Sequence, residues 1–413
     1  MSHSLKSRLP IFCLSSQNWF HELWTNKQHL MDRLAKQGFD VLYVCKGSKP
    51  LLKYMSATYD ESDVFPAPGI VRVTPHLYLA ESPELPLFGL FPYTLYFERF
   101  LFKLNRLKAA FLHAQSQGKL PVLWVYHPGF GHYLDSLPKP YFLLYDCVDD
   151  YASFPSAAGN VKRQEWIRSG EHQLLTQAHL VTTTAPALQE SKSLISNNCH
   201  YVHNVGDFDH FNLAETQAFE LPNRLFGIAG PKIGFFGAIS SYKVDIDLLV
   251  QLAKARPEWS ICLMGPVGGH DSHSSLSQLK KCPNVHFLGP VEYNDLPQFL
   301  AAMDVLMIPY RSSDHTLHVF PIKFFECLAT GKPVVVTPLP AYEAYREVVY
   351  TAGTAVEFES SIFKAMTEDT AEDKAERVTL ARRHDWNSRL SHIKKLADQR
   401  ITEVFGDAFK GIF

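Results

Sequence analysis

One lysine and one glutamate stand three positions apart in the apolar stretch HVFPIKFFECLATGKPVVVTPLP, residues 318–340. Pro321 suits the first position of a helix and Gly331 suits its end, so Lys323 and Glu326 are predicted to share one helix face. A helix that is buried on most sides excludes charged side chains. The two side chains must therefore neutralise each other or bind a ligand.

The chemistry that this pair could perform is recognition of an anion that also carries hydroxyl groups. The loop SSDHTLHVF delivers backbone N–H groups to the helix N-terminus, where the dipole favours an anion such as diphosphate. Lys323 adds a full positive charge there, and the Glu326 carboxylate can accept hydrogen bonds from the vicinal hydroxyls of a ribose. The pair therefore favours a nucleotide diphosphate. The alternative is a surface Glu–Lys pair worth about 0.2–0.5 kcal/mol, and the bulky apolar neighbours argue against it.

Short apolar runs alternate with helical patterns along the chain, which predicts parallel sheets built from βαβ units. The strands expected in the first half are 9–16, 39–45, 121–128, 140–150, 178–185 and 200–205. The strands expected in the second half are 232–239, 259–266, 285–291, 304–310 and 333–338. Helices are expected near 245–256, 274–282, 294–303 and 321–330, and again from about 361 onward. The predicted fold class is therefore α/β, with two doubly wound sheets in tandem.

The segment 206–231 is irregular and contains several Pro and Gly residues, which predicts an interdomain linker. We therefore place one domain at 1–215 and a second at 216–390, and expect a helical segment at 391–413 that packs back on the first domain. With two such domains, a ligand would most naturally bridge the cleft between them.

In open α/β sheets, ligands bind at the carboxyl ends of the strands. The first-half residues that follow predicted strands and could bind a ligand are Ser16, Gln17, Trp19, His127 and Asp149. The corresponding second-half residues are Gly237, Lys243, Gly265, His318 and Phe320. His127 has an alternative role as a structural residue at a strand end, and Asp149 with Asp150 could instead cap a following helix.

Length and composition restrict the class of protein. A chain of 413 residues with 46% hydrophobic and 20% charged residues is typical of a soluble globular protein with two domains. A formal net charge of −2 gives no reason to expect nucleic acid as a partner. The seven cysteines show no Cys-x-x-Cys spacing, which indicates reduced, buried thiols in a cytoplasmic protein. No stretch is long enough for a transmembrane helix, and the N-terminal apolar run is too short for a signal peptide.

The run 84–114 is rich in Phe, Leu and Tyr, with Arg99, Lys103, Arg106 and Lys108 interspersed. Two interpretations stay open. The run could be an amphipathic element lying on an anionic bilayer, with its basic side chains toward the headgroups. It could equally be an ordinary long helix that covers the apolar face of the first sheet.

Seven segments carry a resemblance to known proteins: NWFHELWTNKQHLMDRLAKQGFDVLYV, YDCVDDYASF, AHLVTTTAPALQES, HNVGDFDHF, IGFFGAISSYKVDIDLLVQLAKARPEWSICLMGPV, PNVHFLGPVEYNDLPQFLAAMDVLMIPYR and FPIKFFECLATGKPVVVTPLP. Together they resemble a group 1 (family 4 type) retaining glycosyltransferase of the GT-B fold, in the branch of the teichuronic acid biosynthesis glycosyltransferases. The resemblance implies two Rossmann-like domains that face an interdomain cleft. The domain at 1–215 would take the acceptor, and the domain at 216–390 would take a nucleotide-sugar donor.

The family signature is a glutamate, seven residues, and a second glutamate. The second matches Glu326, to which the resemblance assigns the ribose hydroxyls, whereas the first falls on His318 and leaves the donor sugar open. Pro321 and Lys323 match a Pro-x-Lys element of the related branch. Many members hold the diphosphate with an arginine and a lysine, and here only Lys323 and Lys243 are available. The remaining donor-side candidates are Gly237, Gly265 and Phe320.

In the first domain, the resemblance places a histidine against the donor sugar or the acceptor, and His127 matches it by position. His127 and Lys323 are therefore the catalytic candidates. The acceptor-side candidates are Ser16, Gln17, Trp19 and Asp149.

The implied reaction moves a sugar from a nucleotide-diphosphate donor to a hydroxyl of a glycan or lipid-linked acceptor, with retention, in cell-surface polysaccharide biosynthesis. No metal or other cofactor is expected, because basic side chains and backbone amides would stabilise the leaving diphosphate. The expected location is cytoplasmic, with peripheral contact at the inner membrane surface as an open question. The alternatives are a nucleotide-sugar epimerase on the same fold and a catalytically silent glycan-binding homologue. A Rossmann oxidoreductase is disfavoured because no Gly-x-Gly-x-x-Gly follows either first strand.

Overall fold

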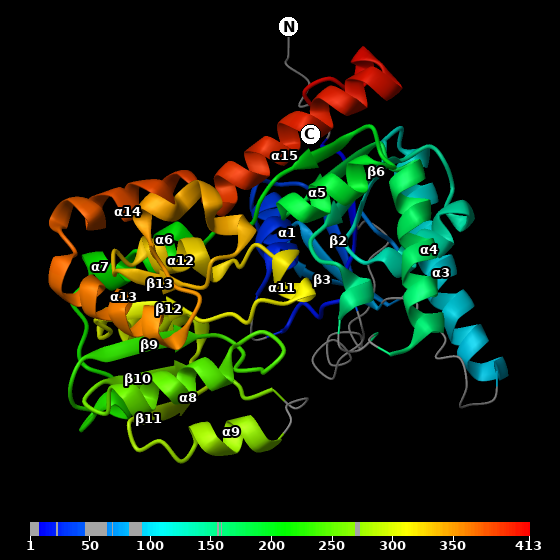
Figure 1. The fold of residues 1–413 in the computed structure, drawn as a ribbon. Helices are drawn as coiled ribbons and strands as arrows, with labels where there is room; N and C mark the ends of the chain where they lie inside the picture. The colour runs from blue at the N-terminus through cyan, green and yellow to red at the C-terminus, as the bar shows by residue number, and fades with distance from the viewer. Residues whose placement is uncertain are drawn as a thin grey trace, which may run out of the picture. The chain divides into compact units, whose positions relative to one another are not determined.

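The computed structural model describes residues 8–21, 24–45, 64–67, 69–81, 93–154, 157, 159–268 and 273–413. The chain divides into two compact units (Figure 1). Unit 1 comprises residues 1–202 together with 390–413, and unit 2 comprises 203–389. The segment that we interpreted as a linker carries the short helices α6 (Phe208–Phe211) and α7 (Leu213–Thr216) and belongs to unit 2.

Unit 1 contains an eight-stranded sheet in the order β3-β4-β2-β1-β5-β6-β7-β8. All neighbouring strands are parallel except β3, which runs antiparallel to β4. The strands are β1 (Ile11–Leu14), β2 (Val41–Cys45), β3 (Ile70–Thr74), β4 (Leu77–Glu81), β5 (Val122–Val125), β6 (Phe142–Cys147), β7 (Leu180–Thr183) and β8 (Cys199–Tyr201). The helices include α1 (Asn26–Lys36), α3 (Tyr93–Ser116), α4 (Val161–Gln177) and α5 (Pro186–Ser193).

Unit 2 contains a six-stranded, fully parallel sheet in the order β11-β10-β9-β12-β13-β14 (Figure 1). The strands are β9 (Lys232–Phe236), β10 (Ser260–Met264), β11 (Val285–Gly289), β12 (Val305–Ile308), β13 (Val334–Val336) and β14 (Tyr350–Thr351). Numbered within the unit, this order is 3-2-1-4-5-6, the doubly wound order of dinucleotide-binding folds. The predicted architecture of two doubly wound parallel sheets is thus confirmed.

Helices cover both faces of the unit 2 sheet, whose strands β10, β12 and β13 are buried along their whole length. On one face α8 (Ile246–Ala255) packs against α9 (His273–Leu279) and α13 (Ala355–Glu368). On the other face α12 (Lys323–Ala329) packs against α6 and α14 (Ala371–Arg383), and α10 (Leu296–Ala301) packs against α7. The last helix, α15 (Trp386–Phe405), begins in unit 2 and continues into unit 1.

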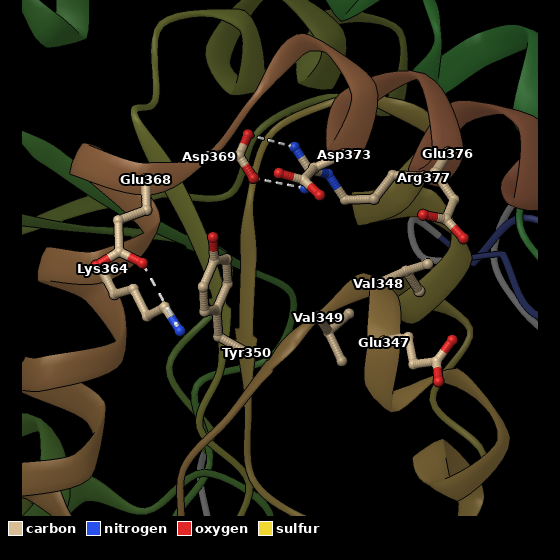
Figure 2. A pocket seen from close by; sticks show the side chains of 10 residues that line it. All are labelled: Glu347, Val348, Val349, Tyr350, Lys364, Glu368, Asp369, Asp373, Glu376 and Arg377. Carbon is tan, nitrogen blue, oxygen red and sulfur yellow. Dashed lines mark hydrogen bonds and ion pairs between the residues drawn. The ribbon is translucent and has the colours of Figure 1, made fainter.

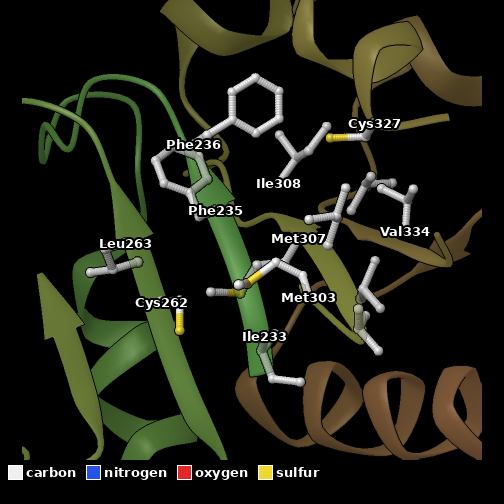
Figure 3. Close-up of a cluster of buried hydrophobic side chains, with 14 of the residues drawn as sticks. Ile233, Phe235, Phe236, Cys262, Leu263, Met303, Met307, Ile308, Cys327 and Val334 are labelled. Atoms are coloured by element: carbon white, nitrogen blue, oxygen red, sulfur yellow. The ribbon is translucent and has the colours of Figure 1, made fainter. Parts of the chain in front are cut away.

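The core of unit 2 is centred on β9 and its neighbour β12 (Figure 3). Ile233 and Phe235 of β9 lie beside Met307 of β12, and Met303 fills the space against the strand. A Cβ on Gly234 would lie 2.7 Å from the Met303 Cγ, so a larger residue at this strand position would displace the Met303 side chain. The close packing fixes the carboxyl ends of β9 and β12, where ligand-binding residues are expected.

Helix α3 covers part of the run for which two interpretations stayed open. In its described part Leu104, Leu107 and Phe111 are buried in the core of unit 1. Lys103 forms an ion pair with Glu81 at 3.2 Å, and the buried Arg106 donates to the Gly69 carbonyl at 3.0 Å. This part of α3 therefore covers the sheet, and two of its basic side chains have protein partners. Residues 84–92 of the run lie outside the described residues.

Within the described ranges, no helix has the length and apolarity needed to cross a membrane.

Candidate functional site

Helix α12 carries the two charged residues of the opening stretch. It runs from Lys323 to Ala329, with Ile322 as its N-cap. We had predicted Pro321 at the first position of the helix. This was wrong, because Pro321 lies two residues before it. The Pro321 carbonyl accepts a hydrogen bond from the Phe324 N–H at 3.1 Å, so the proline closes a tight turn before the helix begins. The helix has seven residues, and its dipole is correspondingly modest.

Lys323 does not form an ion pair with Glu326. Its Nζ donates a hydrogen bond to the hydroxyl of Tyr310 at 2.8 Å and lies 5.6 Å from the centre of the Phe235 ring. A Cβ built on Gly237 would lie 3.2 Å from both the Cε and the Nζ of Lys323. The ammonium group is thus held beside the first residue after β9, in the first turn of a helix whose dipole disfavours a cation there.

Tyr310 follows β12 and was not among our candidates. Its side chain is buried, and its backbone forms an antiparallel bridge with Val244. Burial alone would raise the pKa of the Tyr310 hydroxyl, but the ammonium groups of Lys323 and Lys243, with the hydrogen bond from Lys323, lower it overall. Two cations therefore act on one buried phenol. The signal that could have revealed Tyr310 is its place at the end of the strand beside β9.

Lys243 lies on the loop that follows β9. The Lys243 carbonyl accepts from the Arg311 N–H at 2.7 Å, which ties this loop to the residues that follow β12. Its Nζ lies 5.5 Å from the Tyr242 ring. Because β9 and β12 are neighbours whose connections run to opposite sides of the sheet, their carboxyl ends form the topological switch point of unit 2. Lys323, Lys243 and Tyr310 all lie there.

Glu326 is a buried carboxylic acid. Its side chain is 7% exposed, and within the described part of the chain it has no hydrogen-bond or ion-pair partner. Burial raises the pKa of Glu326 to about 8; Lys323 acts in the opposite sense, and the Asp207 carboxylate adds to the increase. An unpartnered carboxyl of this kind has two oxygens available to accept hydrogen bonds from a ligand.

The segment 204–212 holds α12 in place from the side. The Asn204 side-chain amide donates to the Phe320 carbonyl at 2.8 Å, and the Asn212 amide donates to the Ala329 carbonyl at 2.9 Å. A Cβ on Gly206 would lie 2.8 Å from the Glu326 backbone nitrogen. The segment therefore contacts the turn before α12, the middle of the helix and its last residue, which fixes the position of the Glu326 backbone.

Gly237 and Gly265 follow the adjacent strands β9 and β10, as predicted. Both have positive φ, +114° and +148°. A Cβ on Gly265 would lie 2.1 Å from the Gly237 carbonyl oxygen, so a side chain there would force the two loops apart. The loops stay paired beyond the strands, because the Gly237 N–H donates to the Met264 carbonyl at 2.8 Å.

The loop before α12 is more structured than we expected. Residues 314–317 form the short helix α11 (Asp314–Leu317), and the Ser313 and Leu317 N–H groups bond within this turn. The turn therefore uses part of the backbone N–H groups of this loop internally, and the delivery of the others to the start of α12 stays a prediction. His318 is half-buried just after the turn. Phe320 is fully buried and its ring stacks on Phe325 at 5.5 Å, so its side chain belongs to the core.

His127 follows β5 in unit 1, next to β1 at the switch point of that sheet. Its Nδ1 accepts from the Gly129 N–H at 3.0 Å, which leaves the proton on Nε2. Burial lowers the pKa of His127 to about 4, and the cations Lys27 and Arg163 contribute to the decrease. The half-buried imidazole is therefore neutral near pH 7 and can donate a hydrogen bond from Nε2.

The loop after β1 contains the other candidates of unit 1. Ser16 is exposed, whereas the Gln17 side chain accepts from the Thr25 hydroxyl at 2.7 Å, at the start of α1. Trp19 is 7% exposed and its ring lies 5.0 Å from that of Tyr43. Ser16 is therefore the most exposed of these candidates. Trp19 packs against Tyr43 and contributes to the core beneath the loop.

Asp149 and Asp150 follow β6. Asp150 accepts from the Ala152 N–H at 3.2 Å and caps the short 3₁₀ helix η2 (Tyr151–Ser153), which is the alternative that we had kept for this pair. Burial raises the pKa of the neighbouring Tyr151, and the half-buried Asp149 adds to the increase. Within the described ranges, no group of three or more His, Cys, Asp or Glu side chains could hold a metal ion.

A pocket of about 340 Å³ in unit 2 contains none of the predicted site residues (Figure 2). Arg377, which is 1% exposed, donates to both carboxylate oxygens of Asp369, at 2.7 and 2.6 Å, and to the Gly331 carbonyl at 2.9 Å. These bonds join α14 to the end of α13 and to the turn that follows α12. The acidic side chains of the pocket therefore surround a structural ion pair.

Comparisons with known proteins find relatives of this chain by sequence. Residues 230–368 match the family model described as "Glycosyl transferases group 1". A Bacillus subtilis (strain 168) protein named TuaH, described as a teichuronic acid biosynthesis glycosyltransferase, is 31% identical over 307 residues, which are 71% of this chain and 76% of that protein.

Solved structures show a similar fold at low identity. Sucrose-phosphate synthase from Thermosynechococcus elongatus has a TM-score of 0.67 at 17% identity, over 96% of this chain and 100% of that one. Anabaena Alr3699/HepE in complex with UDP-glucose has a TM-score of 0.63 at 16% identity, over 95% of this chain and 100% of that one. These likenesses agree with the GT-B fold that the sequence predicted.

Proposed function

Because the chain belongs to the group 1 glycosyl transferases, we propose that it moves a sugar from a nucleotide-diphosphate donor to a hydroxyl of a glycan or lipid-linked acceptor. The relative named TuaH is assigned to teichuronic acid biosynthesis, and we propose a role in cell-surface polysaccharide biosynthesis for this chain too. Retention of the anomeric configuration is proposed from the family resemblance alone.

The observation that carries the proposal is the separation of two ionisable groups on α12. A surface pair would bring the Lys323 ammonium and the Glu326 carboxylate together. Instead the ammonium lies beside Gly237 at the switch point, and the carboxyl is buried without a partner among the described residues. This arrangement suits a ligand with a diphosphate at one end and a ribose at the other.

We propose the following division of roles in unit 2. Glu326 accepts hydrogen bonds from the two ribose hydroxyls. Lys323, assisted by Lys243, faces the diphosphate and stabilises the negative charge that grows on it as the sugar leaves. The glycines after β9 and β10 let the nucleotide approach the backbone closely, because a Cβ at either position would occupy that space. We propose that no metal is needed, since two lysines can supply the positive charge.

In unit 1 we propose that His127 donates a hydrogen bond from Nε2 to a hydroxyl of the transferred sugar or the acceptor. Its neutral state makes it a positioning donor and not a strong general acid. Ser16 and Asp149 are proposed to contact the acceptor. A lipid-linked acceptor would bring the enzyme to the inner membrane surface, and we keep that contact as part of the proposal.

The test is binding and transfer with a panel of UDP-, GDP- and dTDP-sugars. The correct donor should raise the melting temperature, since a ligand at 100 times its Kd stabilises the folded state by about 2.7 kcal/mol. Glu326→Ala should abolish most of this shift, whereas Glu376→Ala, which removes an exposed carboxylate of the same unit, should keep it. Stabilisation that survives Glu326→Ala would refute the assignment of this carboxyl.

Product analysis with and without an acceptor separates the proposal from its alternatives. A transferase forms a new glycoside only when acceptor is present. Conversion of the donor to an epimer in the absence of acceptor would indicate an epimerase, and binding without turnover would indicate a silent homologue.

A further inference from the structure

Tyr310 is the residue of the unit 2 switch point to which the sequence assigned no role. It is 6% exposed and lies two residues beyond the end of the central strand β12. Its backbone is fixed on both sides, because the Tyr310 N–H donates to the Ile308 carbonyl at 2.9 Å and the residue forms an antiparallel bridge with Val244. The position of its hydroxyl is therefore determined by the sheet and by the loop after β9.

The Tyr310 hydroxyl accepts a hydrogen bond from the Lys323 Nζ at 2.8 Å. A lysine side chain has four rotatable bonds and loses about 1.5–2 kcal/mol of conformational free energy when it is ordered. In this protein the Lys323 side chain is already ordered when the chain has folded, because Tyr310 holds the ammonium beside Gly237 before any ligand binds. An ammonium group has three N–H donors. One is used by Tyr310, which leaves two for phosphate oxygens.

We propose that Tyr310 is a positioning residue that holds the Lys323 ammonium at the carboxyl ends of β9 and β12, in the orientation that meets the diphosphate of the donor. This inference rests on the proposed function, because it assumes that Lys323 faces a diphosphate. It goes further by naming the group that pre-organises the lysine, which should matter most for the charge that develops in the transition state.

The surroundings support a role beyond packing. A buried tyrosine hydroxyl in an apolar core would have its pKa raised, whereas Lys323 and Lys243 together lower that of Tyr310. The phenol oxygen therefore bonds one ammonium group at 2.8 Å and is influenced by the charge of a second. Tyr342 provides the contrast: it is also buried, burial raises its pKa, and its hydroxyl has no hydrogen-bond partner within the described ranges.

The experiment is a double-variant cycle with Tyr310→Phe and Lys323→Met. Tyr310→Phe keeps the ring and deletes only the hydroxyl, so the packing around β12 is preserved. The ligand is whichever of UDP, GDP and dTDP the wild-type protein binds most tightly, with the corresponding nucleoside as the phosphate-free control. Tyr342→Phe is the matched control, since it deletes a buried hydroxyl of the same unit that does not bond Lys323. Thermal unfolding verifies that every variant is folded.

We expect Tyr310→Phe to weaken binding of the nucleoside diphosphate about tenfold, to lower kcat by more than it raises KM, and to leave nucleoside binding unchanged. In the Lys323→Met background the second substitution should have no further effect, because the lysine through which Tyr310 acts is gone. Tyr342→Phe should leave both ligands and turnover unchanged.

Three results would overturn the inference. If the two effects add, or if nucleoside binding falls equally, Tyr310 acts on the fold and not through Lys323. If Tyr310→Phe changes nothing while Lys323→Met weakens diphosphate binding, the positioning role is wrong but the proposed function stands. If Lys323→Met leaves diphosphate binding unchanged, or if none of the three nucleotides binds, the proposed diphosphate site itself is wrong.

Discussion

The Lys323 ammonium and the Glu326 carboxyl share one turn of α12 without forming an ion pair. The ammonium bonds the Tyr310 hydroxyl at 2.8 Å, and the carboxyl has no partner in the described part of the chain. The effect of burial is therefore larger than that of the Lys323 charge, and the pKa of Glu326 is raised to about 8. A protein that keeps an uncompensated buried carboxyl loses stability for it, which is typical of a binding site.

The raised pKa of Glu326 predicts a dependence of stability on pH. The folded state binds the proton more tightly than the unfolded state, whose pKa is near the ordinary 4.5. Between these two values the folded state holds more protons, so stability falls as pH rises; the contribution is complete below pH 4.5 and lost as pH passes about 8. At about 1.4 kcal/mol per pKa unit, the change amounts to a few kcal/mol.

Glu326→Gln should remove this dependence, because the amide does not titrate. The measurement is the free energy of unfolding of both proteins in urea from pH 5 to pH 9. Subtracting one free energy from the other cancels the contributions of all other titrating groups. The difference should grow in favour of the variant as pH rises. Parallel curves would contradict the raised pKa.

The same carboxyl predicts that nucleotide binding releases a proton. Near pH 7 the Glu326 carboxyl of the free protein is mostly protonated, whereas the proposed ribose contact uses its carboxylate form. Calorimetric titration with the nucleoside diphosphate in two buffers of different ionisation enthalpy measures the protons released. Glu326→Gln should release fewer, by up to about one proton. Equal proton release from both proteins would exclude Glu326 as the titrating group.

Much of the fold could be predicted from the sequence, because buried parallel strands are continuous apolar runs. The β3–β4 hairpin was missed for a physical reason. It lies at the sheet edge, where the first two residues of β3, Ile70 and Val71, are buried and the remaining three are not, so β3 makes no long apolar run. Strand β14 has only two residues and gives no recognisable pattern.

The candidate site was predictable only where its residues are close in sequence. Lys323 and Glu326 follow from helical spacing, and the glycines follow from their place after strands. Tyr310 could not be paired with Lys323 in this way, because their contact depends on how α12 returns over the end of β12. The contact of Gly206 with α12 likewise joins segments that lie far apart along the chain.

Gly206 should be required for nucleotide binding although it is not proposed to contact the ligand. A Cβ there would lie 2.8 Å from the Glu326 nitrogen and 2.9 Å from the Phe325 carbonyl carbon, and backbone atoms cannot rotate away. Gly206→Ala should therefore move α12, lower the free energy of unfolding by about 1–3 kcal/mol and weaken nucleotide binding.

The matched control for Gly206→Ala is Gly353→Ala, where the nearest atoms to an added Cβ lie at 3.4 and 3.8 Å. That variant should keep both the unfolding midpoint and the nucleotide affinity of the wild-type protein. Gly206→Ala with unchanged affinity would show that the Glu326 carboxyl does not depend on this contact.

His127 should remain neutral over the whole range in which the enzyme is folded near neutral pH. Burial, with Lys27 and Arg163, lowers its pKa to about 4, below the ordinary 6.5. The neutral imidazole therefore contributes stability that is complete above pH 6.5 and lost as pH falls through about 4. The proton resonance of the His127 Cε1–H, identified by its loss in His127→Ala, should not shift between pH 5.5 and 8, and a midpoint near 6.5 would contradict this.

The same variant tests the proposed role of His127 in transfer. Because His127 belongs to unit 1, His127→Ala should leave the affinity of unit 2 for the nucleoside diphosphate unchanged while it lowers kcat about tenfold, as expected for one lost hydrogen bond. His113→Ala, which removes a histidine whose ring bonds its helical neighbour Gln117 at 2.8 Å, is the control. Equal turnover of the two variants would show that His127 is a structural residue at the end of β5, since a donor to the sugar or acceptor must act on the chemical step.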